Sequence, residues 1–194
     1  MTTPRSINGG TVCTTGASSG MGRAIAEHPG ALGAHVFLTG RTAEPMEEST
    51  RRIKPAGERQ PAAGQADVAT PDVTDSGALT EWIQGAADST GRLDALINNG
   101  GFGDVGSSII DGDPEMWRGM LDVNVLALTV GRQAGVRAMR TTGSEGNIIN
   151  TSSIATLRRD SGVYGVTKYA VSCITATLRQ ELEDDPIRVT AILP

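Results

Sequence analysis

The sequence predicts an α/β protein built on a doubly wound parallel sheet. Short β-rich runs of apolar residues alternate with longer helical patterns along the chain. Uninterrupted apolar strands of this kind belong to parallel sheets that helices cover on both faces. The 194 residues contain no internal repeat or linker and suit one domain, residues 1–194. We expect the strand order 3-2-1-4-5-6, which is usual for such sheets.

Three strands are expected in the first half of the chain, at residues 11–14, 34–39 and 65–69. A glycine-rich turn follows the first strand, and helices are expected to begin near Met21 and Glu44. Pro29 and Gly30 fall late in the first helix, where proline removes a backbone donor and clashes with the preceding turn. We therefore expect that helix to stop early or to kink.

The second half begins with a helix at residues 75–90, where Leu79, Trp82 and Ile83 recur at helical spacing. A buried strand at 93–97 follows. Asp113 then provides an N-cap and Pro114 a first helical residue, which together predict one long helix to about residue 140. A strand at 147–151, a long helix at 163–183 and a sixth strand at 187–193 complete the alternation.

The composition excludes several classes of function. Lys and Arg number 17 against 22 Asp and Glu, a net charge of −5, and an acidic chain without a basic run is a poor partner for nucleic acid or an anionic membrane. The two cysteines and two histidines lack the spacing of a zinc site or a disulfide scaffold. No segment is long and apolar enough to span a bilayer. We expect a cytoplasmic protein without nucleic-acid, membrane or metal partners.

A glycine-rich loop follows the first strand. Its sequence from Thr15 to Gly22, TGASSGMG, has the spacing GxxxGxG. Gly16 permits a tight turn, Gly20 lets the backbone approach a pyrophosphate, and Gly22 lets the helix pack closely on the strand, with the helix N-terminus facing the anion. Between a first strand and a helix, this loop predicts a dinucleotide site formed by Gly16, Ser18, Ser19, Gly20, Met21 and Gly22.

Four further segments follow this loop in order. They are Asn98-Asn99-Gly100-Gly101 after the fourth strand, Asn124 in the long helix, Ser152-Ser153 after the fifth strand, and Tyr164-x-x-x-Lys168. With them the chain resembles the short-chain dehydrogenases/reductases of the TGxxxGxG type over essentially its whole length. The resemblance implies a Rossmann-like fold and hydride transfer between a nicotinamide cofactor and a carbonyl or alcohol.

The Tyr164 and Lys168 pair carries the expected chemistry. Residues four apart on a helix share one face. A tyrosine hydroxyl is a weak acid at neutral pH, and a nearby ammonium stabilises its anion. Tyr164 is thereby suited to donate a proton to a carbonyl oxygen or to accept one from an alcohol. The resemblance implies this acid/base role for Tyr164, and for Lys168 a second role as a ligand of the nicotinamide ribose.

The resemblance implies roles for other residues as well. Ser153 would bond the reacting oxygen, and Ser152 remains an alternative because the loop to the tyrosine is shorter than in the family. Asn124 would anchor a water that relays protons to the lysine. Asn99 and Gly100 would lie beside the cofactor, with Gly100 standing where the family usually has alanine.

The end of the second strand bears on the choice of cofactor. NAD-binding relatives usually carry an acid where this chain has Gly40. Arg41 follows as a permanent cation suited to a 2′-phosphate. These residues favour NADP(H) over NAD(H). For the adenine contact we choose Asp72-Val73, with Asp67-Val68 as the alternative.

We therefore expect an NADP(H)-dependent oxidoreductase acting on a small-molecule carbonyl or alcohol, in a homodimer or homotetramer. The sequence stops at Pro194, after the sixth strand, where the family continues into a substrate-covering segment. The alternative is therefore a truncated, non-catalytic NADP(H)-binding module. An extended-type epimerase or dehydratase also uses a Tyr-x-x-x-Lys pair, but the GxxxGxG spacing disfavours it.

Overall fold

The computed structural model describes residues 6–57, 64–106 and 108–194. Six parallel strands form one sheet in the order β3-β2-β1-β4-β5-β6, which confirms the predicted fold class and strand order. Every predicted strand is found, with boundaries shifted by two residues or fewer. The strands are β1 (Thr11–Thr15), β2 (His35–Thr39), β3 (Gln65–Ala69), β4 (Ala95–Asn98), β5 (Asn147–Thr151) and β6 (Arg188–Ile192).

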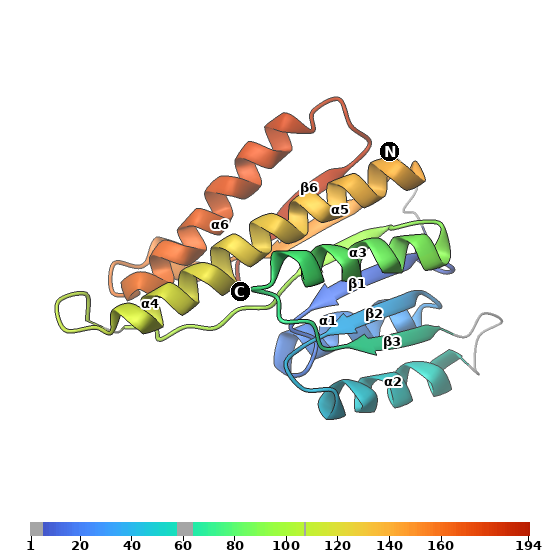
Figure 1. Cartoon of the computed structure of the whole chain (residues 1–194), viewed down its shortest axis with the longest axis horizontal. Helices are drawn as coiled ribbons and strands as arrows, with labels where there is room; N and C mark the ends of the chain where they lie inside the picture. Colours follow the sequence, from blue (N-terminus) through green and yellow to red (C-terminus); the bar gives the residue numbers. More distant parts are fainter. Residues whose placement is uncertain (1–5, 58–63, 107) are drawn as a thin grey trace.

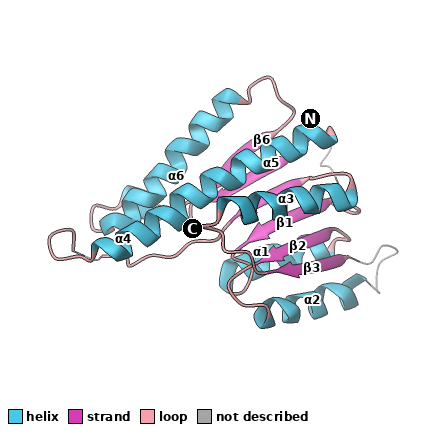
Figure 2. Cartoon of the chain, in the orientation of Figure 1, coloured by secondary structure: helices cyan, strands magenta, loops and turns pink. Residues whose placement is uncertain are grey.

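Helices cover both faces of the sheet, and each face has its own core (Figures 1 and 2). In Figure 1, α3, α5 and α6 lie in front of the sheet and α1 lies behind it. Successive residues of β1 supply opposite cores, with Cys13 in the core that includes α3 and α5 residues and Val12 in the core that includes α1 and α2 residues. The helices are α1 (Gly20–Ala31), α2 (Glu44–Gly57), α3 (Ser76–Thr90), α4 (Pro114–Leu121), α5 (Leu128–Thr142) and α6 (Gly162–Glu181).

Pro29 lies in the last turn of α1, and the helix ends at Ala31. The carbonyl of Pro29 accepts hydrogen bonds from the backbone N–H groups of Leu32 and Ala34, both at 3.0 Å. These bonds close the helix end and lead the chain into β2. The helix therefore continues two residues past Pro29 and does not stop before it as predicted. In the described part of the chain, no helix combines the length and the apolar character that crossing a bilayer requires.

The long helix predicted from Pro114 to about residue 140 is interrupted, and that prediction was wrong in this respect. Asp113 caps α4 as expected, accepting from the backbone N–H of Glu115 at 3.0 Å. Between α4 and α5, however, Asp122–Ala127 form a π-helical segment with Asn124 fully buried inside it. A π turn holds one residue more than an α turn and is frequent at functional sites. Apolar spacing alone does not reveal it.

A buried arginine on α5 connects the sheet to α6. Arg132 is only 2% exposed. Its Nε donates to Asn150 Oδ1 (3.0 Å), and its Nη2 donates to the Val171 carbonyl (3.2 Å) and Thr175 Oγ1 (3.1 Å). Asn98 on β4 also donates to Asn150 Oδ1 (3.0 Å). Burial lowers the pKa of Arg132 to about 10. This network fixes β4, β5 and α6 beneath the cleft described next.

Candidate active site

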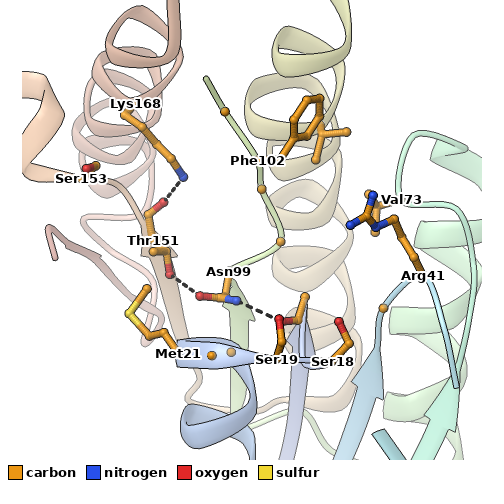
Figure 3. Close-up of a pocket in the computed structure, with 18 of the residues that line it drawn as sticks. Ser18, Ser19, Met21, Arg41, Val73, Asn99, Phe102, Thr151, Ser153 and Lys168 are labelled. Atoms are coloured by element: carbon orange, nitrogen blue, oxygen red, sulfur yellow. Dashed lines mark hydrogen bonds between the residues drawn. The ribbon is translucent and has the colours of Figure 1, made fainter. Parts of the chain in front are cut away.

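A cleft of about 820 Å³ lies at the carboxyl ends of the strands, where ligands bind in doubly wound sheets. It extends from the loop after β1 to the first turns of α6 (Figure 3). The sequence-predicted residues that line it are Gly16, Ser18, Ser19, Gly20, Met21, Gly22, Arg41, Asp72, Val73, Asn99, Gly100, Ser153, Tyr164 and Lys168. Asn124 is the predicted site residue that the structure places outside this lining.

The glycine-rich loop has the geometry of an anion cradle. Gly16 and Gly20 adopt φ values of 66° and 52°, which favour glycine. A Cβ on Gly22 would lie 2.1 Å from the Gly16 carbonyl oxygen, so the helix start leaves no room for a side chain. Ser19, the N-cap of α1, makes no side-chain capping bond. The first-turn N–H groups therefore lack a side-chain acceptor, and this end of the cleft fits a phosphate group.

The Asn99 side chain holds the floor of the cleft together (Figure 3). Its Nδ2 lies 3.3 Å from the carbonyl oxygens of both Thr15 and Gly16, and its Oδ1 accepts from Thr151 Oγ1 at 3.3 Å. In return, Thr15 Oγ1 accepts from the backbone N–H groups of Asn99 (3.1 Å) and Gly100 (2.9 Å). One amide thus joins the ends of β1, β4 and β5. Sequence reasoning placed Asn99 beside a cofactor but did not foresee this bracing.

Tyr164 and Lys168 lie in the first turns of α6 at the other end of the cleft. Lys168 Nζ is 5.7 Å from the centroid of the Tyr164 ring and donates to the Thr151 carbonyl oxygen at 2.9 Å. Lys168 is 4% exposed, and burial lowers its pKa to about 8. The lysine is therefore a desolvated cation held beside the tyrosine.

The two serines after β5 differ in how their hydroxyls are used. Ser152 is buried, and its hydroxyl lies 2.9 Å from the Lys168 carbonyl oxygen and 2.8 Å from Ser172 Oγ. Ser153 Oγ accepts from the backbone N–H of Ala155 at 3.1 Å and caps a short 3₁₀ turn, Ile154–Leu157. An acceptor hydroxyl keeps its own proton to donate. Ser153 is therefore the better suited of the two to bond a substrate oxygen.

Asn124 acts on the cleft through the segment that follows Gly101. Its Oδ1 accepts from the backbone N–H of Phe102 (3.0 Å), and its Nδ2 donates to the Phe102 carbonyl (2.7 Å) and to Thr167 Oγ1 (3.1 Å). The next residue, Gly103, lies against Tyr164 so closely that a Cβ there would fall 2.0 Å from the ring. Asn124 thus positions a segment that packs directly on Tyr164.

The opposite end of the cleft contains Arg41 and Val73, away from Lys168 and Ser153 (Figure 3). Asp72, next to Val73 in the chain, also lines the cleft. Asp72 accepts from the backbone N–H (2.9 Å) and hydroxyl (2.7 Å) of Thr74, and these bonds hold its pKa below the ordinary value. The alternative, Asp67, does not line the cleft and is paired with His35 at 2.5 Å.

Sequence reasoning missed several lining residues. Thr151 is the most informative of them, because its carbonyl and hydroxyl contact Lys168 and Asn99 respectively. Its position at the carboxyl end of a predicted strand, where ligands bind in such sheets, could have identified it from the sequence. The others are Thr70, Pro71, Phe102, Gly103, Val105, Val123 and Pro194, and the cleft is also lined by Gly40, Gly101 and Ser152, which the sequence had already singled out. Among the described residues, no cluster of three or more His, Cys, Asp or Glu side chains is arranged to hold a metal ion.

The chain is similar in sequence and in fold to known proteins. The short chain dehydrogenase family model matches residues 10–194. An uncharacterised oxidoreductase of Staphylococcus saprophyticus is 35% identical over 182 residues, which are 93% of this chain and 75% of that protein. A metagenomic short-chain oxidoreductase in complex with NADP has a TM-score of 0.88 and 32% identity, over 98% of this chain and 84% of that one. A short-chain dehydrogenase/reductase from Burkholderia phymatum in complex with NAD has a TM-score of 0.89 and 25% identity, over 98% and 67%. The chain therefore belongs to the short-chain dehydrogenase family.

Proposed function

We propose that this protein is an NADP(H)-dependent oxidoreductase that interconverts a ketone or aldehyde with an alcohol. The observation that carries the proposal is one continuous cleft with an anion cradle at one end and Tyr164 beside a buried Lys168 at the other. A dinucleotide laid along the strand ends would place its phosphates on the α1 N-terminus and its nicotinamide near the tyrosine.

The loop from Gly16 to Gly22 would hold NADPH by its phosphates, and the cofactor would supply a hydride for the carbonyl carbon. Tyr164 donates its hydroxyl proton to the carbonyl oxygen, and Ser153 donates a hydrogen bond to the same oxygen. Lys168, held by the Thr151 carbonyl at 2.9 Å, stabilises the tyrosine anion that remains. Alcohol oxidation reverses these proton movements. Asn124 acts as a positioning residue, because it holds Phe102 and the next residue, Gly103, packs on the Tyr164 ring.

Three features support NADP(H) over NAD(H). Gly40 offers no carboxylate to the adenosine ribose, and Arg41 lines the adjoining part of the cleft. Arg41 is exposed, so its guanidinium is accessible to a 2′-phosphate. The metagenomic relative of known structure was crystallised with NADP, although the Burkholderia protein was crystallised with NAD.

Tyr164→Phe tests the reaction assignment. Removing the hydroxyl should lower turnover by about 100-fold or more, while the Kd for NADPH stays within about twofold of wild type, because the ring is kept. Tyr169→Phe is the matched control, since Tyr169 lies on the same helix and is 66% exposed. Retained turnover in Tyr164→Phe would remove the tyrosine from the mechanism. NADPH binding by wild type without turnover of any ketone or aldehyde tested would instead favour a non-catalytic binding module.

We also propose that the chain forms a homodimer or homotetramer through α4 and α6. Leu121 and Leu126 are 44% and 54% exposed, and Val166 and Tyr169 on α6 are 57% and 66% exposed. Apolar side chains gathered on adjoining helices are typical of interfaces between subunits. Light scattering after size exclusion should give twice or four times the chain mass of 20.1 kDa. A monomeric mass at micromolar concentration would contradict the proposal.

A further inference from the structure

Arg23, on the first turn of α1, connects two segments that are separate in the sequence. Its Nη2 donates to the carbonyl oxygen of Ser18 at 2.7 Å and lies 3.3 Å from the carbonyl oxygen of Pro45. Ser18 belongs to the glycine-rich loop, and Pro45 belongs to the first turn of α2. Arg23 does not itself line the cleft. Any effect on a ligand must therefore pass through the segments that it holds.

Both segments lie against Gly40, the residue before Arg41, and on the α2 side a Cβ there would fall 3.2 Å from Met46 Sδ. The backbone N–H of Ala17 donates to the carbonyl of Thr39 at the end of β2, at 3.0 Å. A Cβ on Gly40 would lie 3.2 Å from the Ser18 Cβ and 3.3 Å from its hydroxyl. Ser18, Gly40 and Arg41 all line the cleft, and Figure 3 shows Ser18 and Arg41 on the same side of it, away from Lys168.

The charge of Arg23 is not neutralised by an ion pair among the described residues. Its Nη2 contacts, at 2.7 and 3.3 Å, are with uncharged carbonyl oxygens, and its Nε is buried without a partner in the part of the chain that the structure describes. The neighbouring acid on the same helix, Glu27, lies 3.8 Å from Arg52 instead. A partly buried cation without a counter-ion raises the positive potential nearby.

We propose that Arg23 is a positioning residue that sets the preference for a phosphate on the adenosine ribose. It holds the Ser18 loop and the first turn of α2, which follows Arg41 closely in the chain, at a fixed separation, and it carries a positive charge. The inference rests on the proposed NADP(H) function. It assigns to Arg23 a selective effect on the 2′-phosphate, because the pyrophosphate shared by NADPH and NADH would lie on the start of α1 at Gly20–Gly22.

The experiment measures Kd for NADPH and for NADH by quenching of tryptophan fluorescence, in wild type and in Arg23→Met. The substitution should raise the Kd for NADPH about tenfold, which corresponds to about 1.4 kcal/mol, and the Kd for NADH by less than about threefold. Arg23→Lys keeps the positive charge but not the planar guanidinium group. Its Kd for NADPH should lie between those of wild type and Arg23→Met. It also serves as the test if Arg23→Met does not fold, as judged by a thermal melt without cofactor.

Arg52→Met is the matched control, because it removes one positive charge from the neighbouring helix α2 without touching the loop or the turn. It should leave the ratio of the two Kd values unchanged. An equal loss of NADPH and NADH binding in Arg23→Met would overturn the inference, as would an equal change of the ratio in Arg52→Met. A wild type with no preference for NADPH would refute the proposed cofactor choice and this inference together. A preference retained in both Arg23 variants would refute the inference alone.

Discussion

Replacing Lys168 with methionine makes the burial of its charge measurable as a pH dependence of stability. Lys168 is 4% exposed, and its ammonium is satisfied by the Thr151 carbonyl at 2.9 Å rather than by a carboxylate. Desolvation by burial therefore lowers its pKa from 10.5 to about 8 in the folded protein. The unfolded chain, in contrast, keeps the proton until the ordinary value is reached.

The sign and size of the effect follow from proton binding. Between pH 8 and pH 10.5 the unfolded state binds more protons than the folded state at Lys168, so the free energy of unfolding rises with pH. The difference between the two pKa values corresponds to about 3 kcal/mol in all. Roughly 2.5 kcal/mol of this is gained between pH 7 and pH 10. The Lys168→Met protein has no such group and should lack this gain.

The assay is urea unfolding of both proteins without cofactor at pH 7, 8, 9 and 10, followed by tryptophan fluorescence. Titratable groups that do not contact Lys168 are present in both proteins and cancel in the difference between them. That difference should change by about 2.5 kcal/mol in favour of wild type from pH 7 to pH 10. A difference that stays constant within about 0.5 kcal/mol would show that the Lys168 charge is solvated, and would refute the reasoning.

Four further substitutions test the packing of the cleft and of the network beneath it. Gly22→Ala places a Cβ 2.1 Å from a carbonyl oxygen and should cost about 1–3 kcal/mol in urea unfolding, whereas Gly100→Ala, with its nearest atom at 3.2 Å, should stay within about 1 kcal/mol of wild type. Gly103→Ala places a Cβ 2.0 Å from the Tyr164 ring, and steady-state kinetics should show kcat lowered at least about tenfold with an unchanged Kd for NADPH. Arg132→Met removes a buried charge, and every oxygen that the guanidinium contacts keeps another donor. Its melting temperature should therefore equal or exceed that of wild type.

The strands were predictable because short β-rich runs alternate with helical patterns, and their order because it is usual for doubly wound sheets. β1, for example, is buried at all of its positions, as a central strand of a parallel sheet must be. The glycine spacing from Gly16 to Gly22 was equally informative, since a side chain at Gly22 would collide with the backbone of Gly16. In both cases the requirement is local, so it is visible in neighbouring residues.

The contacts that shape the site depend instead on residues far apart in the chain. Asn124 bonds both backbone groups of Phe102, which lies 22 positions earlier. The π turn accommodates this asparagine without altering the apolar spacing around it. Arg23 likewise bonds the carbonyl of a residue 22 positions later. Every residue has a backbone carbonyl that can accept a hydrogen bond, so these contacts cannot be recognised from the residue types in the sequence. The chemistry of this site could therefore be inferred from its side chains, whereas its rigidity comes from backbone acceptors that only the folded structure identifies.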